Sequence, residues 1–167
     1  MQHEQLTAEE TDADVFRDSP ARYLGYSNEV GEAFRVVLPT KAVWFTYGVA
    51  SGYVMCDAAD KGFRVFTGWP GEDSEERTRL TLLKSVDALL WQTLASVVVP
   101  GFTINRLCWG TRMVLVKGVR LPGHVGKYMS VAVGLGAIPF IIKPIDRVID
   151  HFMDLVVRPC ILKTNRN

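Results

Sequence analysis

Three charge-free apolar runs constrain this chain more than any other feature of its sequence. They cover residues 42–56 (AVWFTYGVASGYVMC), 88–104 (ALLWQTLASVVVPGFTI) and 128–142 (YMSVAVGLGAIPFII). The apolar residues of the first run surround the helix instead of forming one stripe, which is typical of either a buried core helix or a membrane span. A helix from 41 to 60 would be roughly 30 Å long, close to the thickness of a bilayer core.

The surroundings of the runs favour the membrane interpretation. Charged residues bracket each run at both ends, and Gly48 and Gly52 form a G-x-x-x-G pair inside the first run. That spacing allows helix backbones to approach closely in lipid. Aromatic residues near the ends of the runs are typical of a membrane interface, and six of them lie there: Trp44, Tyr53, Trp91, Phe102, Tyr128 and Phe140.

We therefore predict an all-α, polytopic helical membrane protein with three short transmembrane helices, near 41–59, 86–105 and 127–143. Amphipathic surface helices are expected at 22–38, 107–119 and 144–158. The polar stretch 61–80 is expected to be an exposed loop with a turn at Trp69-Pro70-Gly71. The predicted domain plan is a polar N-terminal arm at 1–20, a single helical membrane domain at 21–159 and a short basic tail at 160–167.

Several polar residues and prolines refine this plan. Pro100-Gly101 predicts a kink in the second span, because a membrane helix tolerates proline where neighbouring groups satisfy the freed carbonyls. Pro139 and Pro144 predict the end of the third span and a bend into the last helix. The Gln92 amide lies within the second run and is expected to hydrogen-bond across helices. Glu32 and Arg35 are three residues apart and are expected to pair on the surface.

The charges are distributed unevenly along the chain. Eight acids lie within residues 1–35, which does not fit a cleavable secretory signal or mitochondrial presequence, so any organelle address is expected within the mature chain. No acid lies between Asp87 and Asp146, a stretch with six Lys or Arg residues, which predicts a loop on the positive-inside face. The net charge of +1 argues against nucleic-acid binding.

No catalytic, cofactor or metal motif is present in the sequence. The three histidines lack metal-ligand spacing, the three cysteines lack the spacing of a metal knuckle or redox pair, and there is no nucleophile elbow, Walker loop or dinucleotide fingerprint. Asp146, Asp150 and Asp154 share one helix face, and a solvated face is favoured there over a cation site. We predict no catalytic residue, no cofactor, no metal and no small-molecule substrate.

The candidate site residues are therefore expected to mediate helix packing and membrane contacts, not catalysis. Gly48 and Gly52 are expected to mediate helix packing. Asn105 and Arg106 end the second run, while Asp146 and Arg147 follow the third, so these four side chains are expected at the membrane interface.

Four blocks of sequence carry a resemblance to a known family. They are RYLGYSNEVGEAFR at 22–35, WFTYGVASGYVMCDAADKG at 44–62, VDALLWQTLASVVVPGFTINRLC at 86–108 and GLGAIPFIIKPIDRVIDHFMDLVVRP at 134–159. Together they resemble the mitochondrial fission process protein family, also called the mitochondrial 18 kDa proteins. The resemblance implies an integral, multi-pass protein of the mitochondrial inner membrane that promotes fission and shapes that membrane, without enzymatic activity. Lys41, Lys143 and the segment 63–80 depart from the family pattern.

The leading hypothesis is a non-enzymatic inner-membrane protein of fission and inner-membrane organisation, acting through helix packing and partner contacts. Its expected partners are membrane lipid and other inner-membrane proteins. The alternative is a supernumerary structural subunit of a respiratory-chain complex or of the ATP synthase, and a third hypothesis is a soluble all-α enzyme. A transporter is disfavoured because the ionisable residues lie at the ends of the runs.

Overall fold

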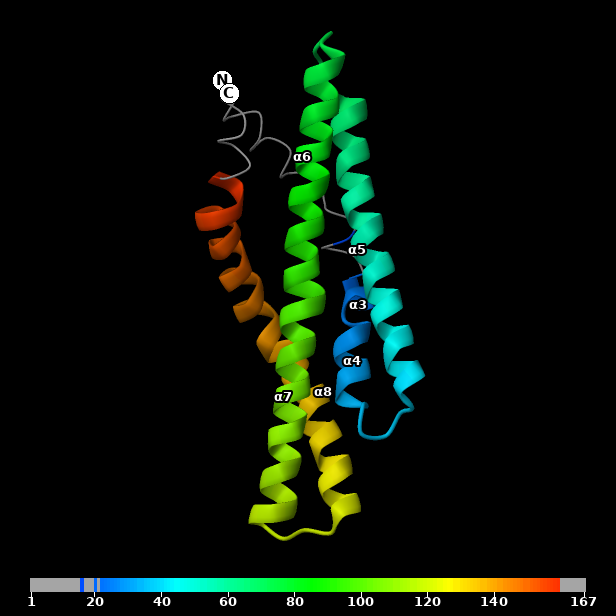
Figure 1. Cartoon of the computed structure of the whole chain (residues 1–167), viewed down its shortest axis with the longest axis vertical. Coiled ribbons are helices and arrows are strands. Elements are labelled where there is room, and N and C mark those ends of the chain that lie inside the picture. Colours follow the sequence, from blue (N-terminus) through cyan, green and yellow to red (C-terminus); the bar gives the residue numbers. More distant parts are fainter. Residues whose placement is uncertain (1–15, 17–19, 21, 160–167) are drawn as a thin grey trace.

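The computed structural model describes Phe16, Pro20 and residues 22–159, and every regular element among these residues is a helix (Figure 1). The all-α prediction is therefore confirmed. The predicted arm at 1–20 and tail at 160–167 lie outside the described residues, apart from Phe16 and Pro20. In chain order the elements are α3 (Arg22–Gly25), α4 (Ser27–Ala33), α5 (Thr40–Gly68), α6 (Ser74–Gln92), η2 (Thr93–Val98), α7 (Val99–Met113), η3 (Val114–Gly118), α8 (Gly123–Phe152) and η4 (Met153–Val157).

A single long helical rod organises the molecule. It runs without a break through α6, η2, α7 and η3, from Ser74 to Gly118, for 45 residues. At about 1.5 Å per residue this rod is close to 70 Å long. Figure 1 shows α5 antiparallel to α6 at one end of the rod and α8 leaving the opposite end. The short helices α3 and α4 pack beside the middle of the rod, against α5, α7 and α8.

The α5–α6 hairpin corrects the predicted exposed loop at 61–80. Helix α5 continues to Gly68 and α6 begins at Ser74, so only residues 69–73 connect them. The charges that indicated a loop instead stabilise the helix, because Lys61 pairs with Asp57 at 2.9 Å and Arg64 with Asp60 at 2.8 Å, each four residues apart. The chain reverses within this short connection, at the predicted Trp69-Pro70-Gly71 position, but through bends at residues 71 and 72 and not through a regular turn.

Two helical stretches of the described chain are long and apolar enough to cross a membrane, and the sequence predicted three. They are Ser74–Gly118 and Gly123–Val157, which contain the second and third runs. Helix α5, with the first run, is not among them. The reason is composition: Thr46, Tyr47, Ser51 and Tyr53 dilute the apolar residues of α5.

The predicted surface helices also need correction. The segment 107–119 is the end of the rod, not a separate amphipathic helix. Helix α8 passes through Pro139 and Pro144 without ending, and 144–158 continues it. The helix predicted at 22–38 is interrupted at Tyr26 and ends at Ala33, followed by turns up to Pro39.

Proline is accommodated in the rod by a change in helix type. The π-helical segment η2 ends two residues before Pro100, and α7 carries this proline within its first turn. Proline has no N–H and its ring crowds the preceding turn, so the wider π geometry gives it room. The helix therefore continues through Pro100-Gly101.

Two small apolar clusters hold the helices together. One joins Trp91 and Ala95 to Ile145, Ile149 and Met153. The other joins Ala33 to Ile104 and Cys108, with partly buried apolar residues of α8 around it.

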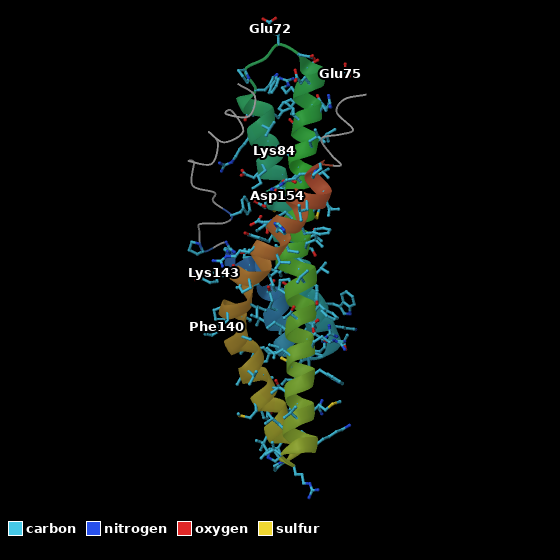
Figure 2. All side chains as sticks on the ribbon, turned by 90° about the vertical axis from the view of Figure 1, so that its left-hand side faces the viewer. Glu72, Glu75, Lys84, Phe140, Lys143 and Asp154 are labelled. Carbon is cyan, nitrogen blue, oxygen red and sulfur yellow. The ribbon has the colours of Figure 1, made fainter. Side chains whose placement is uncertain are left out.

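Many large apolar side chains remain outside these clusters. Of the six aromatic residues expected at an interface, Tyr53 and Trp91 are buried, and the other four are 62–78% exposed. Figure 2 shows Phe140 pointing away from the helices.

Candidate functional site: a buried polar centre

Helix α4 carries three polar side chains into the middle of the molecule. Asn28 and Glu29 are 0% exposed and Glu32 is 3% exposed. The helix is enclosed by α5, α7 and α8, and Gly31 allows a close approach, since a Cβ there would lie 2.0 Å from Thr46 Oγ1. Buried polar groups destabilise a fold unless they are paired, so the partners of these three side chains decide what this centre can do.

Glu32 is the best-satisfied member of the centre. Its carboxylate accepts hydrogen bonds from Tyr47 Oη at 2.8 Å, Asn105 Nδ2 at 2.7 Å and the Arg35 guanidinium, whose Nε lies at 2.7 Å. Burial opposes ionisation, but these hydrogen bonds outweigh it and lower the pKa of Glu32. An ionised Glu32 therefore connects α4 to α5 and to α7. The predicted Glu32–Arg35 pair is confirmed, but Glu32 is not on the surface.

Asn28 binds the irregular part of the rod. Its Nδ2 donates to the carbonyl oxygen of Val97, within η2, at 3.0 Å. Gly101 makes this approach possible, because a Cβ there would lie 2.9 Å from Tyr47 Oη and 3.0 Å from Asn28 Nδ2. The π segment thus lies where α4 contacts the rod, and Asn28 satisfies one of its carbonyls.

Glu29 differs from its neighbours because its carboxylate is unsatisfied. No other described residue donates a hydrogen bond to either of its oxygens, and the side chain is fully buried. Burial, reinforced by the negative charge of Asp146, raises the pKa of Glu29 to about 8. At neutral pH this side chain is mainly a neutral carboxylic acid.

A second polar group joins α5 to the rod. Asp57, 0% exposed, accepts hydrogen bonds from Gln92 Nε2 at 2.8 Å and from Lys61 Nζ at 2.9 Å. Ser96 Oγ in turn donates to Gln92 Oε1 at 2.8 Å. The predicted cross-helix hydrogen bond of Gln92 is therefore confirmed, and its partner is a buried carboxylate.

The three aspartates of α8 and η4 contact three different partners. Asp146 pairs with Arg22 of α3 at 2.7 Å, and Asp150 accepts a hydrogen bond from Trp91 Nε1 at 2.7 Å. Asp154 pairs with Arg158, which also contacts Asp87 of α6. These carboxylates therefore connect α8 to α3 and α6. Within the described residues, no group of three or more His, Cys, Asp or Glu side chains is arranged to hold a metal ion.

The residues singled out in the sequence lie in different environments. Asn105 belongs to the buried centre and Asp146 to the α3 contact, whereas Arg106 and Arg147 are exposed, Arg106 over the Phe102 ring. Their interfacial placement stays a prediction.

Gly48 and Gly52 face open space, with no atom of the described chain within 4 Å of an added Cβ. The glycines at helix contacts among the described residues include Gly31, Gly62, Gly101, Gly126 and Gly134. A packing role for the G-x-x-x-G pair would therefore need a second molecule.

Sequence reasoning missed Asn28, Glu29, Glu32 and Asp57 as a buried set. The available signal was three polar residues on the apolar side of a short helix, which equally fits a solvated turn.

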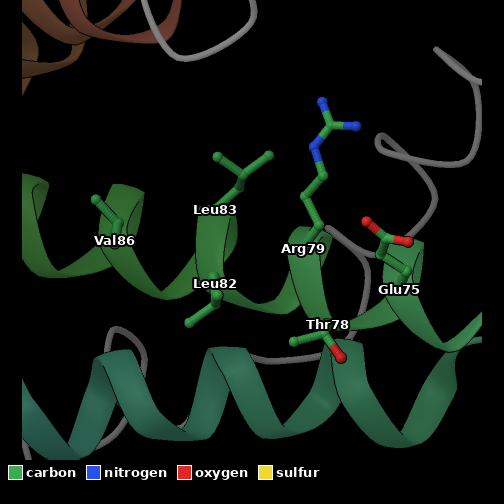
Figure 3. A pocket seen from close by; sticks show the side chains of 6 residues that line it. All are labelled: Glu75, Thr78, Arg79, Leu82, Leu83 and Val86. Atoms are coloured by element: carbon green, nitrogen blue, oxygen red, sulfur yellow. The ribbon is translucent and has the colours of Figure 1, made fainter. Parts of the chain in front are cut away.

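The structure also contains a shallow depression on α6, away from the polar centre. All of its lining residues lie on one face of that helix (Figure 3): Glu75, Thr78, Arg79, Leu82, Leu83 and Val86. Ligand pockets bring polar groups together from several elements, and this depression does not.

Among the described residues, the fold and the centre together define an all-helical protein with two span-length apolar helices, many exposed large apolar side chains and carboxylates enclosed between the helices. The family model for the mitochondrial 18 kDa protein matches residues 13–81 and 70–153. The chain belongs to this family.

Similar proteins include mitochondrial fission process protein 1 of Homo sapiens, 48% identical over 145 residues, which are 87% of this chain and 86% of the relative. The Caenorhabditis elegans protein of the same name is 46% identical over 145 residues, 87% of each chain. An uncharacterised protein of Acanthamoeba polyphaga mimivirus is 29% identical over 136 residues, 80% of this chain and 71% of its own. No solved structure matches the chain.

Proposed function

We propose that this chain is an integral, multi-pass protein of the mitochondrial inner membrane that takes part in mitochondrial fission and inner-membrane organisation. It acts through helix packing and contacts with membrane lipid and other inner-membrane proteins, not through catalysis. The relatives named as mitochondrial fission process proteins support the fission role. The exposed apolar side chains of the two long helices support the membrane role.

The exposure of the two long apolar helices carries the proposal. Only 33% of the apolar window of Ser74–Gly118 and 22% of that of Gly123–Val157 are buried inside the protein. A core helix of a water-soluble protein of this hydropathy would be mostly buried, because burying apolar surface is the main driving force for folding. Lipid is the solvent that accepts these exposed side chains.

Two spans lead to a different topology from three. The rod and α8 form an antiparallel hairpin, so the turn at 119–122 lies on one side of the membrane and the connection between α5 and α6 at 69–73 on the other. Three spans would have placed the N-terminus and the basic 106–127 segment on the same side. Under the positive-inside rule the turn at 119–122 faces the matrix and the 69–73 connection faces the intermembrane space.

The membrane proposal is tested by extraction and by protease protection. The tagged full chain is expressed in cells that lack their own relative, and isolated mitochondria are treated with alkaline carbonate. We expect the chain in the membrane pellet. After the outer membrane is opened, protease should cleave within 69–73 and spare 119–122. Recovery in the carbonate supernatant would contradict membrane insertion.

Mitochondrial morphology tests the fission role in the same cells. Loss of the chain should elongate the network and re-expression should fragment it again. Native gels separate the proposal from the alternative of a supernumerary subunit. Stoichiometric migration with one respiratory complex or the ATP synthase, without a morphological effect, would favour that alternative.

A further inference from the structure

The end of the α7–α8 hairpin projects beyond the other helices. We call residues 109–129 the α7–α8 tip: it comprises the end of α7, all of η3, the turn and the start of α8. Figure 1 shows that the tip extends past the turn between α4 and α5. The two helices of the tip pack closely on each other, since a Cβ on Gly126 would lie 2.5 Å from Val116 Cγ2. The outer surface of the tip is therefore free for something beyond this chain.

The charge of the tip is entirely positive. Arg112, Lys117, Arg120 and Lys127 lie within it, together with His124, and no acid occurs from residue 88 to residue 145. None of these four cations takes part in an ion pair among the residues that the structure describes. Arg112, Lys117 and Arg120 are exposed. An unneutralised cluster of this kind matches a negatively charged surface.

The backbone places one of these cations at the apex. Arg120 has a φ of 58°, the left-handed region that glycine usually occupies at the end of a helix. The Leu121 N–H closes the cap by donating to the Leu115 carbonyl at 3.0 Å. A cation at this position also faces the negative end of the helix dipole of η3. The turn thus carries an exposed charge where a neutral glycine would fit with less strain.

Apolar side chains surround the cations. Trp109, Val114, Val119 and Tyr128 are 57–62% exposed, and Met129 is 47% exposed. Aromatic and aliphatic residues interleaved with Lys and Arg are the composition of a lipid–water interface, where long cationic side chains reach the phosphates and apolar side chains enter the hydrocarbon. An acidic protein partner would complement the charges but would leave this apolar collar without a matching layer.

We propose that the α7–α8 tip is a docking surface for the headgroups of anionic phospholipids. Arg112, Lys117, Arg120 and Lys127 contact lipid phosphates, and Trp109, Tyr128 and Met129 of the collar lie in the hydrocarbon beneath them. Val114 and Val119 lie among the cations and contact the apolar part of the headgroup region. The proposal rests on the proposed insertion of the α7–α8 hairpin into a membrane. It adds which lipid the hairpin selects and which residues make the selection.

Lipid selectivity is measured on the full chain reconstituted into phosphatidylcholine vesicles. A trace of spin-labelled phosphatidylglycerol or spin-labelled phosphatidylcholine is added, and the motionally restricted fraction of each label is read by electron paramagnetic resonance. We expect the anionic label to be preferred by roughly fivefold or more at low salt. The preference should fall strongly at 1 M salt, because screening weakens exposed charges.

A matched pair of triple variants locates the preference. Arg112→Gln with Lys117→Gln and Arg120→Gln removes three tip charges, and Arg64→Gln with Arg79→Gln and Lys84→Gln removes three charges from the α5–α6 hairpin. The tip variant should lose most of the preference and the control variant should keep it. Both should restrict the phosphatidylcholine label as the unchanged chain does, which verifies that they fold and insert.

The other outcomes overturn separate statements. An equal loss of the anionic-label preference in both variants, or no loss in the tip variant, would show that the tip is not the lipid site. The second result is also the one expected if the tip binds an acidic protein instead of lipid. In the unchanged chain, a preference for the anionic label that does not fall at 1 M salt would also show that the tip is not the lipid site. This test does not depend on the folding of the tip variant. Absence of a restricted component for either label would contradict membrane insertion itself.

Discussion

The α5–α6 and α7–α8 hairpins are both long antiparallel helix pairs, but their charges are organised differently. In α5–α6, acids and bases alternate and pair along the helix, as in Asp57–Lys61 and Asp60–Arg64. In α7–α8, no acid occurs from residue 88 to residue 145, and the cations gather toward one end. Paired charges of both signs suit water, whereas a charge-free stretch with cations at its end suits a bilayer and its headgroups.

The contacts between helices differ in the same way. Gly134 of α8 allows contact with Cys108 of α7, and Cys108 Sγ donates to the Ser130 carbonyl at 3.3 Å. Helix α6 instead begins with a side-chain N-cap, which is common at solvent-exposed helix ends. The Asp73 side chain accepts hydrogen bonds from the backbone N–H groups of Glu75 and Glu76. Helix α4 lies where the two hairpins meet and contributes Asn28, Glu29 and Glu32. The chain therefore combines a hairpin suited to water with a hairpin suited to a bilayer, and the polar centre connects the two.

Loss of Glu32 should destabilise the contact between the two hairpins more than loss of any exposed charged residue. Glu32→Ala leaves Arg35, Tyr47 and Asn105 without their shared acceptor, so we expect a loss of about 3–5 kcal/mol in unfolding free energy. The exposed pair gives the control, since Asp60→Ala should change stability by less than about 1 kcal/mol. Unfolding in detergent micelles measures both. Similar losses in the two variants would mean that α4 does not join the hairpins.

Glu29 should make stability depend on pH. Its folded pKa of about 8 lies above the ordinary value of 4.5, so its stabilising contribution is fully present below about pH 4.5 and is lost as the pH rises through 8. Between pH 6 and pH 8 we expect a loss of about 2 kcal/mol.

The Glu29→Gln variant isolates this effect, because the amide stays neutral throughout. Subtracting its pH profile from that of the unchanged chain should leave the Glu29 contribution alone. Parallel profiles would show that Glu29 is hydrated or paired in the folded protein, and that the polar centre is open.

The glycine contact of α7–α8 offers a test with a control on the same helix. Gly134→Ala places a Cβ 2.4 Å from Cys108 Sγ and 3.1 Å from Ala33 Cβ, and overpacking of this kind should destabilise by about 1–2 kcal/mol. At Gly136 nothing lies within 4 Å, so Gly136→Ala should stabilise slightly through helix propensity. Thermal unfolding in detergent compares the two. If both alanines stabilise, the α7–α8 contact is looser than the structure shows.

The smallest effect is expected at the exposed end of the α5–α6 hairpin. Asp73→Ala removes the N-cap of α6, whose Oδ1 lies 2.9 Å from the Glu75 backbone nitrogen, and should destabilise by about 1 kcal/mol or less. Glu72→Ala, one residue earlier, should be neutral. Amide hydrogen exchange at the start of α6 would show the fraying directly. Equal exchange in both variants would argue that membrane or partner contacts hold this end.

A feature of the fold could be predicted when residues close to it in the sequence determine it. The all-helical class, the chain reversal near Trp69-Pro70-Gly71 and the cross-helix role of Gln92 were predictable from neighbouring residues. The spans were miscounted because the first run, although free of charge, contains Thr46, Tyr47, Ser51 and Tyr53, which lower its mean hydropathy. Residues 61–68 were taken for a loop because the pattern of charges did not reveal their four-residue pairing along a helix.

The candidate site was less predictable than the fold. Gly48 and Gly52 had the spacing for packing, yet Gly31, Gly101 and Gly134 lie at the contacts. Spacing places residues on one side of a helix, but the direction of that side depends on neighbours far away in sequence. The same dependence hid Glu29, whose burial requires three other helices.

Composition, periodicity and residue order were enough to establish the all-helical class, the family, the apolar stretches and the acid-free segment. The packing of the helices was needed to show that the two span-length helices leave most of their apolar windows unburied, that the rod continues through Pro100, and that Glu29 and Glu32 of one short helix have opposite pKa shifts. Desolvation and hydrogen bonding depend on what surrounds a group in space, and a linear pattern does not contain those surroundings. Two glutamates three residues apart can therefore differ in charge.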